Sequence, residues 1–224
     1  MSLKVFIENN SGAYKRMFVD NGWTVVLDLH EADLVQLEGG ADVSPELYGE
    51  AKHPSTYSSE EADKYTYQLF QHAQELGIPV AGICRGSQFL SVMGGGKLWQ
   101  NINGHATGHM HDLLDIESGI IIEGVSSTHH QQHRPADNAI IIATAFPQLA
   151  THKSSGVEDC VVGMSVDDVV DGDFYDSLGQ DIEAFYYPHI NALGYQPHPE
   201  FFGVDHPCQM YYFDIIAKYL KLRA

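Results

Sequence analysis

The sequence predicts an α/β fold: a mostly parallel central sheet flanked by helices, with a β-rich second half. Three observations support this prediction. Short apolar, β-branched runs alternate with helical patterns in the first half, which is typical of parallel strands joined by crossover helices. One apolar run leads through a glycine-flanked cysteine into a helical pattern, as in a strand–turn–helix elbow. The second half contains short strand-like runs separated by turns.

In the first half, the apolar runs predict strands at Leu3–Ile7, Trp23–Leu27, Leu34–Leu37 and Pro79–Ile83. The clearest helix is predicted over Ser58–Leu76. Ser58 and Glu61 have the spacing of a capping box, and Gly77 follows the last turn. Strands and helices in alternation favour a sheet covered on both faces, with its functional site at the carboxyl ends of the strands.

In the second half, strands are expected at Ile120–Glu123, Ile140–Thr144, Val161–Ser165, Glu183–Tyr187 and Ala192–Gln196, extending the same sheet. A C-terminal amphipathic helix is expected over His206–Leu222, because apolar residues recur there at helical spacing. The chain shows no repeat, low-complexity segment or Pro/Ser-rich linker, so one domain is expected over residues 1–224.

The composition is acidic, with 30 Asp and Glu against 12 Lys and Arg and a net charge of −18. Such a surface repels phosphate backbones, so no nucleic-acid partner is expected. No apolar run reaches the ~18 residues of a membrane span, and the first residues lack the features of a signal peptide. The three cysteines are odd in number and widely spaced. They predict no disulfide framework and favour a cytoplasmic location.

The segment Gly82–Gly86 contains the predicted nucleophile, Cys84. Small residues two positions before and after it permit a tight turn that exposes its side chain above the sheet. The turn also places the sulfur at a helix N-terminus, which favours thiolate over thiol. A buried structural cysteine beside a glycine-rich turn is the alternative for this segment taken alone.

Far downstream, His198-Pro199-Glu200 follows a predicted strand. A thiol hydrolase needs a base near its sulfur and a third group to orient that base. Pro199 stiffens the link, so His198 and Glu200 can point to the same side of an extended segment.

These segments resemble the class I glutamine amidotransferase family, whose hallmark is G-x-C-x-G-x-Q followed by a distant His-Pro-Glu. Three further stretches resemble its γ-glutamyl hydrolase branch, which includes γ-glutamyl-γ-aminobutyrate hydrolases: EGGADVSPELYGE at 38–50, GGGKLWQNI at 94–102 and VSSTHHQQ at 125–132. The resemblance covers about residues 34–205. It implies a flavodoxin-like, three-layer fold. Ser91 and Ser126 stand where that branch commonly has Asn, and Pro197 stands where it has an aromatic residue.

The resemblance implies cleavage of a γ-glutamyl amide through a thioester, with Cys84, His198 and Glu200 as the triad and no cofactor. It also implies an oxyanion hole made by the backbone N–H groups of Gly40 and Arg85. The substrate-binding residues that it implies are Gln88, Ser127, His129 and His130, the last three largely through backbone.

A histidine-rich segment, GHATGHMHD, contains His105, His109, His111 and Asp112. Imidazoles are common metal ligands, but no cysteine joins them and the spacing matches no known motif. A polar lid over the pocket is therefore expected here, rather than a metal site.

Four functions remain open from the sequence. The first is a free-standing hydrolase of a small-molecule γ-glutamyl substrate. The second is a glutaminase subunit that supplies ammonia to a separate synthase, and a homo-oligomer is open in either case. The third is a non-catalytic metal-binding or regulatory protein on the same fold. The fourth, a protease or chaperone with a Cys-His elbow, is disfavoured because Arg85 occupies that His position.

Overall fold

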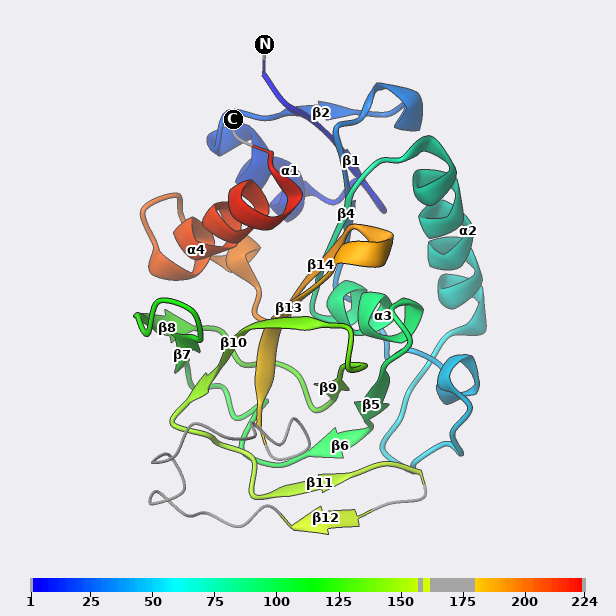
Figure 1. Ribbon diagram of the computed structural model, residues 1–224, viewed down its shortest axis with the longest axis vertical. Coiled ribbons are helices and arrows are strands. Elements are labelled where there is room, and N and C mark those ends of the chain that lie inside the picture. Colours follow the sequence, from blue (N-terminus) through cyan, green and yellow to red (C-terminus); the bar gives the residue numbers. More distant parts are fainter. Residues whose placement is uncertain (1, 157–158, 162–179, 223–224) are drawn as a thin grey trace.

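The computed structural model describes residues 2–156, 159–161 and 180–222. A nine-stranded sheet, in the order β2-β1-β3-β4-β14-β13-β10-β7-β8, is covered by helices (Figure 1). The predicted α/β class is confirmed. The carboxyl ends of β4 and β14 lie side by side near the middle of this sheet.

One half of the sheet is parallel. Its strands are β1 (Lys4–Ile7), β2 (Thr24–Val26), β3 (Leu34–Leu37), β4 (Val80–Ile83) and β14 (Ala192–Tyr195). All four strands predicted for the first half are confirmed, three of them shortened at one or both ends. β3 and β4 are buried along their whole length, as expected for parallel strands covered on both faces.

The other half of the sheet is antiparallel and continues from β14. It contains β13 (Ile182–Tyr187), β10 (Ile140–Phe146), β7 (His111–Asp115) and β8 (Ile121–Val125). The expected β-rich extension of the same sheet is therefore confirmed, although β7 was not predicted. Of the strand expected over Val161–Ser165, only Val161 belongs to a described strand, and residues 162–165 lie outside the described residues.

Two small sheets lie beside the main one. β6 (Asn101–Ile102), β11 (His152–Ser154) and β12 (Asp159–Val161) form a three-stranded sheet. β5 (Lys97–Trp99) pairs with β9 (Gln132–Arg134). The sequence did not predict these very short strands, because period-two alternation needs more residues to become visible.

Helices pack on both faces of the sheet, so the core is divided into two main clusters. α1 (Gly12–Asp20) and α4 (Pro207–Ile215) contribute to one cluster. α2 (Glu60–Leu76) and α3 (Arg85–Met93) contribute to the other. Adjacent residues of β4 divide between the clusters, with Val80 in one and Ala81 in the other, because successive strand side chains point to opposite faces.

The predicted capping box at the start of α2 is wrong by one residue. Ser59 is the N-cap, and its side chain accepts a hydrogen bond from the backbone N–H of Ala62. Ser58 forms a parallel β-bridge with Asp42, which keeps its backbone outside the helix. Gly77 ends the helix in the left-handed conformation, φ +70°, as expected for a C-terminal glycine.

The predicted C-terminal helix is present but divided. α4 ends at Ile215 and passes into a π-helical turn, Ile216–Leu220. Within the described residues, no helix combines the length and apolar character that crossing a membrane requires.

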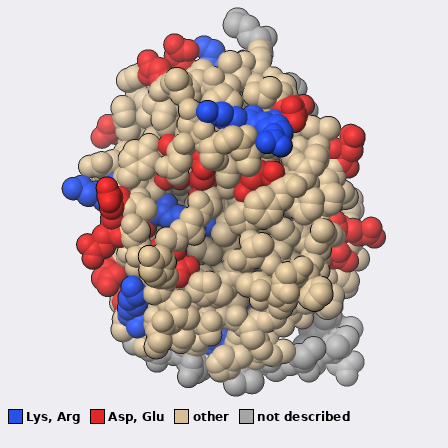
Figure 2. Space-filling view, turned by 180° about the vertical axis from the view of Figure 1, so that it is seen from behind, with Lys and Arg blue, Asp and Glu red and all other residues tan. Residues whose placement is uncertain are grey.

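Charged side chains are unevenly distributed over the surface. On the face in Figure 2, acidic side chains are scattered widely and basic ones gather in a few separate groups. This pattern fits the strongly acidic composition.

Candidate active site

The segment around Cys84 forms the expected elbow between β4 and α3. Cys84 precedes the helix as its N-cap and has φ +51° and ψ −109°, a conformation that L-residues rarely adopt. A Cβ built on Gly82 would lie 2.4 Å from the carbonyl carbon of Gly86, and one built on Gly86 would lie 2.7 Å from the Leu37 Cβ. Both glycines are therefore required by close packing, and the half-buried Cys84 thiol stands at the start of α3.

The sheet brings His198 to the same place. β4 and β14 are neighbouring parallel strands in which Ile83 pairs with Tyr195, and the Cys84 N–H donates to the Tyr195 carbonyl at 3.0 Å. Cys84 therefore leaves β4 beside the point where the chain leaves β14 towards His198. A Cβ built on Gly39 would lie 2.9 Å from His198 Cε1 and 3.7 Å from Cys84 Cβ, so both residues border this glycine.

His198 is held on several sides. Its Nδ1 lies 2.6 Å from Glu200 Oε1, and its backbone N–H donates to Ser126 Oγ at 2.7 Å. Its ring stacks on Phe201 with 4.6 Å between ring centroids. Burial lowers the pKa of His198, but the interactions with Cys84 and Glu200 outweigh this effect and raise the pKa to about 10. The arrangement favours an imidazolium next to Cys84, with Nδ1 engaged by Glu200.

The loop after β3 lies against the elbow. The Gly86 N–H donates to the Glu38 carbonyl at 3.0 Å, and a Cβ built on Gly40 would lie 3.9 Å from Arg85 Cδ. Among the described residues, neither the Gly40 nor the Arg85 backbone N–H has a hydrogen-bond acceptor. Both amides are therefore free to donate beside the elbow, and their assignment as an oxyanion hole stays a prediction.

Tyr14 contributes to this site and was not identified from the sequence. Its hydroxyl accepts the Gly39 N–H at 2.9 Å. Burial, followed by the negative charge of Glu200, raises the Tyr14 pKa well above its usual value, so the hydroxyl stays protonated. Tyr14 lies on α1, for which no boundaries were predicted, and no local motif marks it.

The Arg85 side chain lies in a buried ion cluster. It lies 2.5 Å from Asp63 Oδ1, 2.6 Å from Thr66 Oγ1 and 3.8 Å from Glu8 Oε1. Glu8 in turn accepts the Glu38 N–H at 2.9 Å. The cluster therefore joins α2, the start of α3 and the loop containing Gly39 and Gly40.

The four predicted substrate-binding residues lie in different surroundings. Gln88 is buried, with its amide 3.4 Å from both the Gln131 carbonyl and Gln196 Oε1. The side chains of Ser127 and His129 point into a separate buried cluster, whereas half-buried His130 lies 3.2 Å from Asp42 Oδ1. The assignment of these residues to substrate binding stays a prediction.

That separate cluster also changes the interpretation of the histidine-rich segment. His105 and His111 are buried beside Glu183, whereas His109 is exposed. His105 and His111 therefore do not form the expected surface lid. Sequence reasoning missed Glu183 as their partner, although an acidic residue inside an apolar strand is a signal of a buried polar site.

Comparisons with known proteins identify the family and the fold. The family model described as Peptidase C26 matches residues 24–200. A Mycobacterium tuberculosis protein named "Putative glutamine amidotransferase Rv2859c" is 30% identical over 179 residues, covering 73% of this chain and 49% of that protein. The chain thus spans about half the length of that relative.

Two solved structures share the fold. PurLQS from Thermotoga maritima has a TM-score of 0.63 and 19% identity, with 98% of this chain and 100% of that chain covered. A Thermoplasma acidophilum protein described as "a putative gmp synthase subunit a protein" has a TM-score of 0.57 and 16% identity, with 99% and 97% covered. From the match to residues 24–200, the chain belongs to the Peptidase C26 family, within the class I glutamine amidotransferase-like superfamily.

Proposed function

We propose that this chain is a cysteine-dependent hydrolase that cleaves γ-glutamyl amide bonds. The observation that supports this most is the convergence of Cys84, on a strained elbow, with a Glu200-bound His198 at neighbouring strand ends. A positioned base and an orienting carboxylate are what a thiol nucleophile requires. A purely regulatory role on this fold would not require Cys84, His198 and Glu200 to lie together in this way.

In the proposed reaction, Cys84 Sγ attacks the γ-carbonyl carbon, and the carbonyl oxygen becomes an oxyanion. The N–H groups of Gly40 and Arg85 bind that oxyanion. The His198 imidazolium gives a proton to the leaving amine as the C–N bond breaks, which leaves a thioester on Cys84. Neutral His198 then takes a proton from water as its oxygen attacks the thioester, and glutamate and the thiolate are released.

Glutamyl recognition is assigned to two elements. Gln88 lies one helical turn after the proposed nucleophile, and its backbone N–H donates to the Cys84 carbonyl at 2.9 Å. The loop with Ser127, His129 and His130 would bind the α-amino and α-carboxylate groups through its backbone. Backbone recognition is consistent with side chains of Ser127 and His129 that point inward.

A glutaminase subunit that passes ammonia to a separate synthase is the second candidate. It is favoured by the fold shared with the Thermoplasma protein described as a GMP synthase subunit. Such a subunit would hydrolyse glutamine weakly alone and faster with its synthase, whereas a free-standing hydrolase would turn over γ-glutamyl amines at full rate alone. In either case we expect the enzyme to act in the cytoplasm, where Cys84 stays reduced.

The test is glutamate release from a panel of γ-glutamyl amides and glutamine. We expect Cys84→Ala to abolish release, and Cys208→Ala, which removes the buried cysteine of α4, to retain it. Circular dichroism of both variants controls for folding. Turnover by a folded Cys84→Ala protein would refute the mechanism, and no turnover of any γ-glutamyl amide by the wild type would refute the substrate class.

A further inference from the structure

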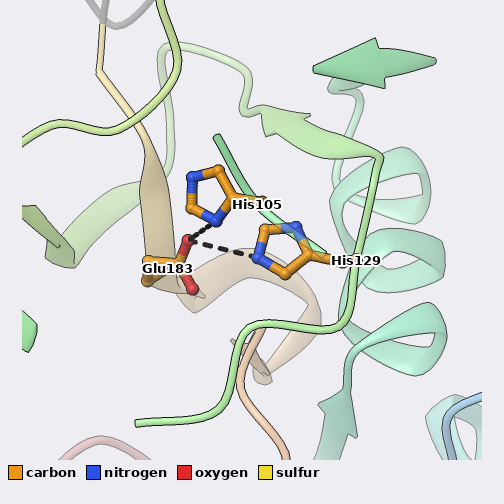
Figure 3. A group of neighbouring side chains, drawn as sticks. All are labelled: His105, His129 and Glu183. Atoms are coloured by element: carbon orange, nitrogen blue, oxygen red, sulfur yellow. Dashed lines mark ion pairs between the residues drawn. The ribbon is translucent and has the colours of Figure 1, made fainter. Parts of the chain in front are cut away.

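The buried cluster beside the triad contains three imidazoles around one carboxylate. Glu183, on β13, is fully buried, and His105, His111 and His129 lie around it (Figure 3 shows His105 and His129). The ligand-type atoms of His105, His129 and Glu183 all lie within 4.8 Å of one another. We propose that these three residues bind a divalent metal ion of the zinc class at a buried structural site.

The distances are longer than hydrogen bonds. His129 Nε2 lies 3.5 Å and His105 Nδ1 lies 3.8 Å from Glu183 Oε1. Nitrogen–oxygen hydrogen bonds are usually about 2.7–3.2 Å. Two ligand atoms that each lie ~2.0 Å from a tetrahedral zinc ion are roughly 3.3 Å apart. Small side-chain shifts would therefore bring the two histidine nitrogens and Glu183 Oε1 to coordination distance from a metal ion placed between them.

Both imidazoles already have the orientation of metal ligands. His129 Nδ1 must donate to the Gln131 carbonyl, 2.9 Å away, because a carbonyl oxygen only accepts. His105 Nε2 likewise donates to Asp181 Oδ2 at 3.2 Å. The remaining nitrogens, His129 Nε2 and His105 Nδ1, face Glu183 and carry lone pairs in the neutral rings that bind a metal ion. Metal-bound histidines typically donate their other N–H to a carbonyl or carboxylate in this way.

Polar atoms in the cluster lack partners, although they are buried. Within the described residues, His129 Nε2 and Glu183 Oε2 make no hydrogen bond, and neither does either ring nitrogen of His111. Ser127 Oγ lies 3.1 Å from His105 Nδ1 and would give up that nitrogen to a metal ion. Buried polar atoms are nearly always satisfied, so the two orphaned acceptor atoms, His129 Nε2 and Glu183 Oε2, leave room for a cation as their partner.

The described ion-pair partners of Glu183 are all histidines. Lys153 Nζ lies 2.8 Å from Asp181 Oδ1, so this lysine forms an ion pair with Asp181. Glu183 faces only histidines and the Gln132 amide among its described ion-pair and hydrogen-bond partners. His111 Nε2 lies 3.7 Å from Glu183 Oε2 and is available as a further ligand. Two imidazoles and a carboxylate are a common ligand set for zinc.

The site would fix a loop that borders the triad. His129 belongs to residues 126–131, and Ser126 at the start of that loop holds the His198 backbone N–H. Glu183 lies on β13, and its backbone carbonyl accepts the Gln196 N–H at 2.7 Å. A metal ion would thus join the loop to β13, which pairs with β14, the strand that leads towards His198. We assign this ion a structural role, since none of its three proposed ligands belongs to the proposed triad.

The test is the zinc content of tag-free protein after exposure to zinc and gel filtration, measured by mass spectrometry. We expect about one ion per chain, the stoichiometry of one closed site. His129→Gln and Glu183→Gln should lose it, whereas His109→Gln, an exposed histidine near His105, should retain it. Cys84→Ser should also retain it, which separates this site from zinc captured by the nucleophile and makes the result independent of hydrolysis.

A second measurement uses only wild-type protein and therefore does not depend on whether the variants fold. Cobalt(II) should give the visible absorption of a four- or five-coordinate nitrogen and oxygen site, and zinc should raise the melting temperature. Failure of the wild type to bind zinc would overturn the proposal. So would full zinc content in folded His129→Gln, or loss of zinc in Cys84→Ser.

Discussion

Replacing Arg85 with Met should destabilise the protein far more than removing a surface cation. The Arg85 guanidinium is 5% exposed and faces Asp63 and Glu8, whose side chains are 5% and 4% exposed. Removing one partner of a buried ion pair costs about 3–5 kcal/mol, because a buried charge is left uncompensated. At roughly 2–4 °C per kcal/mol for a chain of this size, the melting temperature should fall by roughly 6–20 °C.

The matched control is Lys218→Met. Lys218 lies 2.7 Å from Glu117, but both side chains are about half exposed or more, at 46% and 69%. An exposed pair is worth at most ~1 kcal/mol. The loss of stability, measured by thermal and denaturant unfolding, should therefore be severalfold larger for Arg85→Met than for Lys218→Met. Equal, small effects would show that the buried cluster does not stabilise the elbow and its loop.

The cost of Arg85→Met should also depend on pH. Burial is the main cause that raises the Glu8 pKa, and Arg85 counteracts it. Without Arg85 the pKa of folded Glu8 rises further, so the folded variant binds a proton more readily than the unfolded chain. Its stability relative to the wild type should therefore increase as the pH falls towards that pKa. A pH-independent difference between variant and wild type would contradict this account.

Three further predictions concern the triad. His198→Ala should be nearly inactive in glutamate release whereas Glu200→Gln keeps part of the activity, because the base carries protons and the carboxylate only orients it; the reverse order would mean that these roles are misassigned. The folded pKa of His198 is raised from 6.5 to about 10, so its stabilising interactions should be complete below pH ~6.5 and lost as the pH rises through the folded pKa; denaturant midpoints of wild type and His198→Ala should converge over that range, and a constant gap would argue against the ion pair. A glutamine-derived chloroketone should label Cys84 rapidly and Cys208 slowly, because Cys208 is fully buried and burial raises its pKa to about 12; peptide mass spectrometry showing equal labelling would make Cys84 an ordinary thiol.

Features encoded in short sequence segments were predicted well. The first four strands follow from local apolar runs. The elbow follows from Gly82 and Gly86, where an added Cβ would lie only 2.4 and 2.7 Å from neighbouring atoms. The link between His198 and Glu200 also depends only on two residues close in sequence. Local rules are sufficient wherever the deciding contacts are local.

Features that depend on distant contacts were missed or misplaced. The helix start moved from Ser58 to Ser59 because a bridge to Asp42, in another loop, competes for the Ser58 backbone. Tyr14 reaches the site through the packing of α1. Glu183 acquires its histidine partners from two loops and from β7, all far from it in sequence. Such juxtapositions follow from the topology of the sheet, which periodicity alone does not give.

The pairing of β4 with β14 has a consequence for how this protein could be altered. The proposed nucleophile and its base follow strands that pair with each other residue by residue, from Ala192 opposite Val80 to Tyr195 opposite Ile83. The loops at 39–50 and 126–131 enter the same region from other parts of the chain. Exchanging those loops should therefore change which amine is released, while Cys84 and His198 keep their spacing. The two paired strands would thus allow substrate specificity to change without moving the proposed catalytic residues.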